Sequence, residues 1–223
     1  MILSRVSLPH TDLQRSADML AAGLYAEHQL LWQLFPEQPD ATRDFLYRRE
    51  NRNGHVFFYM LSERMPTVGK SGFLVQSKPF KPQLIVGDHL RFELRANAVR
   101  TTHDGSGSKR RKRRDIVEAA IDAHRRTSDD PPASEELRQH AGTRWLESQG
   151  VRGGFTPKSV RVSNHQFVRL RKPGAKNAIR FTYMDYTGVL EVTDPTVFIR
   201  QTVSLGLGRS RSFGCGLMLL SRA

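Results

Sequence analysis

The chain has 223 residues, 38% of them hydrophobic, and its 35 lysines and arginines against 22 aspartates and glutamates give a net charge of +13. Disorder of the whole chain and a membrane-spanning helix are excluded, because the apolar content suits a globular core and no stretch approaches roughly 18 apolar residues. The excess of positive charge, mostly arginine, favours a polyanion as partner, with a membrane surface as the competing interpretation.

The first hundred residues predict a mixture of strands and helices. Apolar and polar side chains alternate over 2–8, which predicts a strand, and this apolar character breaks too early for a signal peptide, so we expect a cytoplasmic protein. An amphipathic helix that includes 24–36 follows, and then a shorter helix over 43–50. Further strands are expected over 55–62, 73–80 and 88–100. We assign residues 1–100 to one domain.

A change of composition marks the next segment, 101–114. It is rich in glycine and serine and ends in an unbroken run of six basic residues at 109–114. We place the boundary between two domains there and interpret the segment as a basic linker or loop. Such a run is usually solvated, and it adds salt-dependent affinity for nucleic acid without belonging to a catalytic site.

Residues 115–223 predict a second domain of the same kind. Its expected elements are helices over 114–126 and 134–150, strands over 159–172 and 179–194, a helix over 195–206 and a last apolar strand. The order of elements in each half is compatible with a β-α-β-β-α-β unit. We therefore predict an α+β fold of two tandem ferredoxin-like domains, with a basic groove between or across them.

Motifs for metal or cofactor chemistry are missing from the sequence. It contains no HExxH, no paired CxxC and no Asp-x-Asp carboxylate cluster, so we expect neither a catalytic metal nor a cofactor. The single cysteine, Cys215, excludes an internal disulfide and a multi-cysteine zinc site. It lies between glycines at the start of an apolar segment, which predicts a buried core residue and not a nucleophile.

A glycine-rich loop precedes the last strand, with glycines at Gly206, Gly208, Gly214 and Gly216. It has neither the Walker spacing nor a dinucleotide fingerprint, and it runs from a helix to a strand, which is the wrong order for both. One interpretation is a turn in which glycine allows positive φ. The other is a grip on a polyphosphate backbone, because Arg209 and Arg211 add two guanidinium groups to the backbone N–H groups.

Basic residues also end the predicted strand over 159–172. Arg169 and Arg171 share one face of that strand, and Lys172 follows them. These three residues are candidates for RNA binding. The alternative is the polar outer face of a half-buried sheet.

Tyr25 and His28 share one face of the predicted helix. They are either solvated polar residues or a reactive pair, because an imidazole transfers protons near neutral pH and a phenol can orient it. In a basic chain without a metal motif, the chemistry that fits is RNA scission by the substrate's own 2′-hydroxyl. That reaction asks the protein only for proton transfer, alignment and cationic stabilisation of the phosphorane.

Three segments, at 25–50, 90–97 and 206–220, resemble the CRISPR RNA-processing endoribonucleases of type I-E Cascade complexes, which belong to the repeat-associated mysterious protein superfamily. The resemblance covers most of the chain except 101–158, which carries the basic run. It implies a tandem ferredoxin-like fold that binds the hairpin of a CRISPR repeat. It also implies metal-independent cleavage 3′ of the stem, which leaves a 2′,3′-cyclic phosphate and a 5′-hydroxyl.

The resemblance assigns roles to individual residues. His28 and Tyr25 match the catalytic histidine and tyrosine, and the glycine-rich loop matches over 206–216. The basic residues of the family's later hairpin fall on Arg169, Arg171 and Lys172, any one of which could contact the scissile phosphate. The expected partners are the repeat hairpin, the mature CRISPR RNA and other Cascade subunits, with no membrane partner and a monomer in isolation. Two alternatives stay open, a non-catalytic module that binds structured RNA and a basic DNA-binding regulator.

Overall fold

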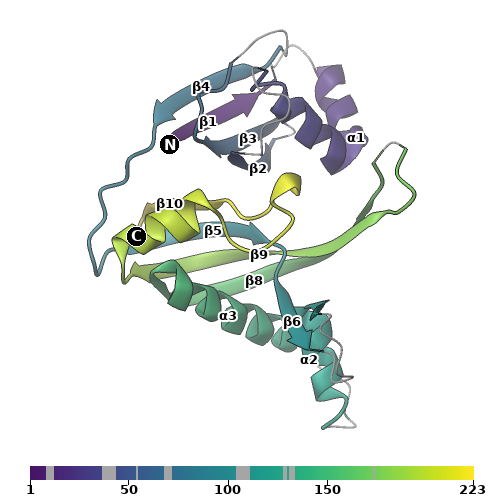
Figure 1. Ribbon diagram of the computed structural model, residues 1–223, viewed down its shortest axis with the longest axis vertical. Coiled ribbons are helices and arrows are strands. Elements are labelled where there is room, and N and C mark those ends of the chain that lie inside the picture. The colour runs from purple at the N-terminus through teal and green to yellow at the C-terminus, as the bar shows by residue number, and fades with distance from the viewer. Residues whose placement is uncertain are drawn as a thin grey trace.

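The computed structural model describes residues 1–8, 13–36, 44–53, 55–67, 72–103, 111–127, 130, 134–172 and 174–223. These residues form two four-stranded sheets and one two-stranded hairpin, and the two larger sheets lie one above the other in Figure 1. Every strand pairing is antiparallel. In this part of the chain, no helix is both long and apolar enough to span a membrane.

The N-terminal sheet contains the first four strands in the order β2-β3-β1-β4. Its elements are β1 (Ile2–Ser7), α1 (Leu13–Trp32), β2 (Phe45–Arg52), β3 (His55–Ser62) and β4 (Leu74–Pro79). The first strand therefore lies between the third and the fourth, with the second at the edge, as in a ferredoxin-like unit. Helix α1 packs on one face of this sheet (Figure 1).

The predicted short helix over 43–50 is wrong, because residues 45–52 form β2 and pair with β3 along their whole length. Phe45 and Tyr47 pack into the core under α1, whereas Leu46 on the opposite face joins the core of the second sheet. Both faces of the first half of this strand are therefore buried. A strand covered on both faces has no polar alternation, and that removed the pattern by which a strand is recognised.

The C-terminal sheet has the order β10-β5-β9-β8. Its strands are β5 (His89–Ala96), β8 (Phe155–Leu170), β9 (Ile179–Val192) and β10 (Met218–Arg222). Its helical segments are α2 (Ile116–His124), α3 (Ser134–Gly153), α4 (Pro195–Val197), the π-helical η1 (Phe198–Ser204) and the 3-10 turn η2 (Arg211–Phe213). The strand order repeats that of the first sheet, so the predicted pair of ferredoxin-like units is confirmed.

Strand β5 belongs to the second unit, although we expected it in the first. We placed 88–100 in the first domain, but β5 pairs with β9 and β10 and is the first strand of the second unit. The chain thus passes from one sheet to the other between β4 and β5. Alternation of apolar and polar residues predicts that a strand is half-buried, and it does not say which sheet buries it.

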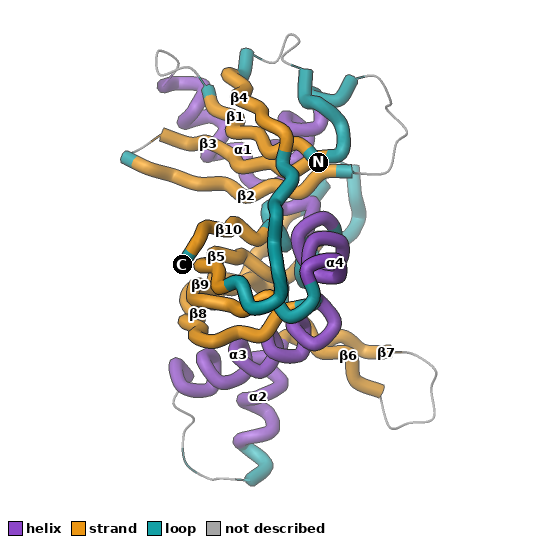
Figure 2. The backbone as a smooth tube through the Cα atoms, turned by 90° about the vertical axis from the view of Figure 1, so that its left-hand side faces the viewer, coloured by secondary structure: helices purple, strands orange, loops and turns teal. Residues whose placement is uncertain are grey.

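The basic segment lies within the second unit and not between the two. Strands β6 (Val99–His103) and β7 (Arg111–Asp115) form a hairpin between β5 and α2, and it points away from the larger sheets in Figure 2. Of the basic run, 109 and 110 lie outside the described residues. Arg114 pairs with Asp122 of α2, which fixes the base of the hairpin to that helix.

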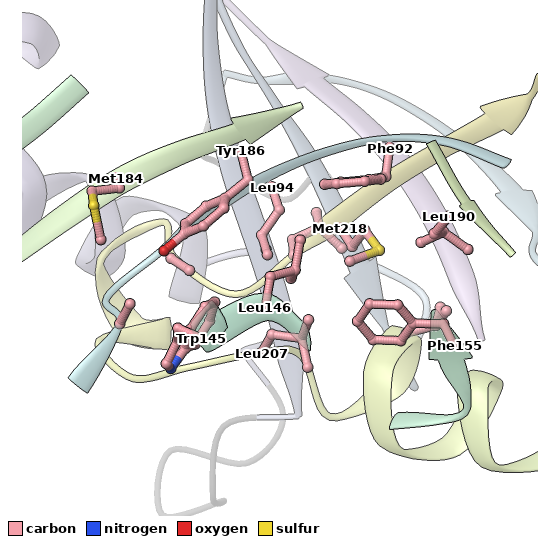
Figure 3. Close-up of a cluster of buried hydrophobic side chains, with 14 of the residues drawn as sticks. Phe92, Leu94, Trp145, Leu146, Phe155, Met184, Tyr186, Leu190, Leu207 and Met218 are labelled. Carbon is pink, nitrogen blue, oxygen red and sulfur yellow. The ribbon is translucent and has the colours of Figure 1, made fainter. Parts of the chain in front are cut away.

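The core of the second unit also holds part of the glycine-rich loop. Trp145 and Leu146 of α3 pack toward Tyr186 and Leu94 of the sheet, and Leu207 of the loop lies in the same cluster (Figure 3). Leu207 is buried. The loop is thereby anchored at one end, and its remaining residues are held at the junction of the two units.

A groove of about 610 Å³ separates the sheets, with lining from both. Apolar side chains such as Leu61, Phe92 and Leu219 form most of it, and the charged lining residues are Arg52, Arg91, Glu50 and Glu93. Positive and negative charges balance within this groove. The basic residues predicted to bind RNA lie elsewhere, at the end of β8, on the turn that follows it and on the glycine-rich loop.

Candidate active site

Helix α1 is interrupted two residues before Tyr25. Gly23 has φ 76° and ψ 178°, which is not helical, and positive φ is a region that glycine enters at little cost. A Cβ atom at this position would meet nothing within 4 Å. Glycine is therefore favoured here by the backbone conformation and not by lack of space. Tyr25 and His28 therefore lie at the start of a separate helical segment, whose direction the break sets.

His28 lies where the two units meet. Its half-buried ring packs against Trp32 and Phe45, with centroid separations of 5.9 and 6.3 Å, and against Phe213 of η2 at 6.3 Å. Phe213 stacks in turn on Phe181 of β9, at 5.6 Å between centroids. The imidazole is thus positioned by α1, by β2 and by the glycine-rich loop together.

Tyr25 brings a third element to the site. Its phenol oxygen accepts a hydrogen bond of 3.3 Å from Nε2 of Gln29, and Nζ of Lys172 lies 5.9 Å from the centroid of its ring. Lys172 follows β8, so the turn between β8 and β9 reaches α1. Of the three basic residues predicted on this segment, Lys172 is the one that the structure places over the ring of Tyr25.

The other two basic residues are exposed on the same pair of strands. Arg169 lies directly opposite Arg180 in the β8–β9 ladder, and Arg171 follows on the turn. Like charges directly opposite one another destabilise a sheet. An anion bound between the two guanidinium groups relieves that repulsion, so the pair is suited to a phosphate backbone.

A buried ion pair, which was not predicted from the sequence, holds the segment of α1 that carries His28. Glu27, next to His28, is 1% exposed and binds the guanidinium of Arg49 on β2. Burial raises the pKa of Glu27, against the lowering effects of the charge and hydrogen bond of Arg49 and the charge of Arg95. Glu27 shares the apolar stripe of the helix with Leu24 and Leu31. A carboxylate within an apolar stripe is the pattern from which a buried ion pair could have been predicted.

Three backbone N–H donors of the glycine-rich loop form hydrogen bonds within the protein. The N–H groups of Leu207, Arg209 and Gly216 donate to the carbonyl oxygens of Gly216, Asn97 and Arg95, at 3.0, 3.1 and 2.7 Å. Of the predicted loop glycines, Gly206, Gly214 and Gly216 are buried and Gly208 is half-buried. The buried glycines shape the loop, and the arginine side chains give a polyanion its charged contacts.

Arg209 and Arg211 carry positive charge on the outside of this loop. Arg209 is exposed, and Nε of Arg211 donates to the carbonyl oxygen of Gly208 at 3.2 Å. Burial and the charge of Arg209 lower the pKa of Arg211 below its ordinary value. The two guanidinium groups repel each other in the absence of an anion, and a bound phosphate would relieve the repulsion.

Replacing Gly206 by alanine is expected to destabilise the protein by about 3 kcal/mol. The new Cβ would lie 2.7 Å from Cδ1 of Leu46 and 2.8 Å from the carbonyl oxygen of Gly216, at φ +74°. Gly174 is the matched control, because it has φ +73° and nothing within 4 Å of its Cβ position. In urea unfolding, Gly174→Ala should lower the free energy of unfolding by about 1 kcal/mol. Equal losses for the two variants would contradict the tight packing of Gly206.

Cys215 has no access to a substrate. Its side chain is buried, which confirms the core position predicted for it, and burial raises the pKa of its thiol to about 12. Among the residues that the structure describes, no group of three His, Cys, Asp or Glu side chains is placed to hold a metal ion.

Comparisons with known proteins agree with this arrangement. The family model described as "CRISPR associated protein" matches residues 1–222. The chain belongs to this family of CRISPR-associated proteins. It is 30% identical over 203 residues to the CRISPR system Cascade subunit CasE of Escherichia coli (strain K12), a match that covers 89% of this chain and 92% of that subunit.

Solved structures resemble this CRISPR-associated protein over its whole length. CRISPR endoribonuclease Cse3 bound to a 19-nt RNA has a TM-score of 0.72 and 24% identity, with 99% of this chain and 100% of that chain covered. The CRISPR-associated protein Cas6e from Escherichia coli str. K-12 has a TM-score of 0.66 and 25% identity, with both chains covered completely, at 100%. The tandem ferredoxin-like fold is therefore shared with both.

Proposed function

We propose that this CRISPR-associated protein is a metal-independent endoribonuclease that processes precursor CRISPR RNA. It binds the hairpin of a CRISPR repeat and cuts 3′ of the stem. The observation that carries the proposal is that Lys172, from a distant segment, lies over Tyr25 on the helix that carries His28. His28 and Tyr25 are half-buried, and His28 contacts Phe213 of the second unit. The similarity to CasE and to the RNA-bound Cse3 supports the same class of substrate.

The chemistry is transesterification by the RNA itself. The 2′-oxygen upstream of the cut attacks phosphorus, the bond from phosphorus to the 5′-oxygen breaks, and the proton of the 2′-hydroxyl is removed as one is delivered to the leaving oxygen. His28 exchanges a proton in this step, because an imidazole can both accept and donate a proton. Tyr25 orients the reacting groups, and the ammonium group of Lys172 stabilises the charge on the phosphorane.

Binding of the hairpin stem falls to the arginines beside this centre. Arg169, Arg171 and Arg180 are exposed at the β8–β9 end of the site, where they can contact phosphates of an A-form stem. A grip of this kind is strong at low salt and slows release. It suits a protein that keeps its product, so we propose that the protein stays with the mature RNA in the cytoplasm as a subunit of a Cascade complex.

Substitution of 2′-deoxyribose just upstream of the cut is expected to stop cleavage by the wild-type protein, in EDTA as well as in magnesium. The cause is loss of the nucleophile, and binding should stay close to that of the all-RNA hairpin. The measurement is a gel assay of cleavage with a parallel filter-binding assay. Cleavage of the deoxy substrate would point to water as nucleophile. Binding without cleavage of either RNA would favour a non-catalytic RNA-binding module.

A further inference from the structure

The glycine-rich loop borders a second cavity that Tyr25, His28 and Lys172 do not line. This cavity has a volume of about 370 Å³ and lies between the loop, the C-terminal part of α3, the end of η1 and strand β6. Arg209 and Arg211 form one side of it, and Arg152 from the last turn of α3 forms another. We name it the arginine pocket.

The positive charge of the arginine pocket favours binding of an anion. Three guanidinium groups line it, and its described lining residues include no carboxylate. Arginine forks match the oxygen geometry of phosphate. The arrangement is suited to one or two phosphate groups, and no ion pair between the described lining residues neutralises the three arginines.

The remaining lining side chains fit a base beside those phosphates. Leu205 is 50% exposed, which is high for a large apolar side chain, and Trp145 contributes an aromatic edge from α3. Gln149 and Gln201 supply amides that both donate and accept hydrogen bonds. Apolar contact, amides and arginines together are the means by which proteins hold unpaired nucleotides.

The arginine pocket is connected to the proposed catalytic centre through η2. Phe213 packs on His28, and Arg211, two residues earlier in the same turn, lines the pocket. Lys172 and the basic end of β8 reach the centre from another element. The β8–β9 turn and the arginine pocket therefore both border the proposed centre, the first through Tyr25 and the second through η2.

The basic hairpin continues the positive charge beyond the pocket. Thr101 lines the pocket and is paired with Arg113 in the β6–β7 ladder. Directly opposed residues of an antiparallel pair project from the same face, so Arg113 extends from the pocket's side of the hairpin. Arg113 of the basic run is thus placed on the same side of the hairpin as the arginine pocket.

We propose that the arginine pocket binds the single-stranded RNA downstream of the cleavage site. The inference rests on the proposed function, under which the stem lies 5′ of the cut and is held by the β8–β9 side. The downstream strand then leaves His28 past η2. Its phosphates bind Arg152 and Arg209, and one of its bases lies against Leu205.

A structural explanation of Arg152 is available, and it makes a different prediction. A cation in the last turn of a helix is stabilised by the helix dipole. If that is its whole role, Arg152→Gln lowers the free energy of unfolding slightly and leaves RNA binding unchanged. Arg144, exposed on the same helix and outside the pocket, provides the matched control, Arg144→Gln.

The test compares three repeat RNAs, each with 2′-deoxyribose at the cut so that none is cleaved. One ends at the cleavage site, one is extended on the 3′ side, and one is extended by the same sequence on the 5′ side. Arg152→Gln should weaken binding of the 3′-extended RNA about tenfold. It should also reduce the salt dependence of that binding by about 0.7 in the log–log slope, as for one phosphate on a single strand.

Arg144→Gln should match the wild type on all three RNAs, and Arg152→Gln should match it on the RNA that ends at the cut. Equal binding of the 3′-extended RNA by Arg152→Gln and wild type would overturn the inference, as would a loss confined to the 5′-extended RNA. Failure of the wild type to bind the hairpin or to cleave the all-RNA substrate would instead refute the proposed function. The two failures are therefore distinguishable.

Discussion

Replacement of His28 by alanine should abolish cleavage of a cognate repeat hairpin while leaving its binding nearly intact. The expected loss of the single-turnover rate is about 10²- to 10⁴-fold, the contribution of a positioned proton-transfer group. Binding should persist because the cationic contacts come from other residues, among them Arg169 and Arg171. The measurements are a single-turnover cleavage assay in EDTA and an equilibrium binding assay with the same RNA.

Alanine at this position also removes the ring contacts with Trp32, Phe45 and Phe213. The variant His28→Phe keeps an aromatic ring there and cannot transfer a proton, so it separates packing from chemistry. It should be as inactive as His28→Ala and closer to the wild type in thermal stability. Wild-type cleavage by either variant would show that His28 is not the proton-transfer group.

Glu27→Gln is expected to destabilise the protein by about 3 kcal/mol, because it removes one partner of an ion pair whose carboxylate is 1% exposed. Cleavage should fall as well, since Glu27 fixes the helical segment that carries Tyr25 and His28. Burial raises the pKa of Glu27, so the whole pair contributes less stability than its disruption costs. Arg49→Met combined with Glu27→Gln should therefore recover part of the loss in urea unfolding.

Glu93→Gln is the matched control for that experiment. Glu93 also pairs with an arginine, Arg48, at 3.3 Å, but its side chain is 56% exposed. The carboxylate of Glu93 is exposed and Arg48 keeps Glu50 as a second partner, so the loss should be about 0–1 kcal/mol. Neither stability nor cleavage should change much. Comparable losses for Glu27→Gln and Glu93→Gln would contradict the positioning role of the buried pair.

Prediction of the fold from sequence succeeded where one face of an element is buried and the other solvated. The alternating residues of β5 and the turn signals around β8 and β9 were sufficient for those strands. It failed for β2, because burial by two different cores removed the polar positions. The sheet to which β5 belongs was also beyond local sequence, since it depends on pairing with β9 and β10, about a hundred residues away.

The candidate site shows the same division. The spacing of Tyr25 and His28 on a helix was visible in the sequence, and their catalytic role stays a prediction. The proximity of Lys172 to Tyr25 was not visible, because it depends on the length and bend of the β8–β9 strands. Arg152 was not predicted as a site residue either, because a single arginine near the end of a helix is common. Only the fold brings it to the same cavity as Arg209 and Arg211.

End-group analysis of the products decides whether cleavage proceeds through the 2′-hydroxyl of the RNA without a metal ion. Wild-type protein would be incubated in EDTA with a panel of repeat hairpins, and the ends of any product identified by mass spectrometry. A 2′,3′-cyclic phosphate on the upstream product and a 5′-hydroxyl on the downstream product are predicted. A 3′-hydroxyl with a 5′-phosphate, or cleavage that requires added metal, would rule out this mechanism.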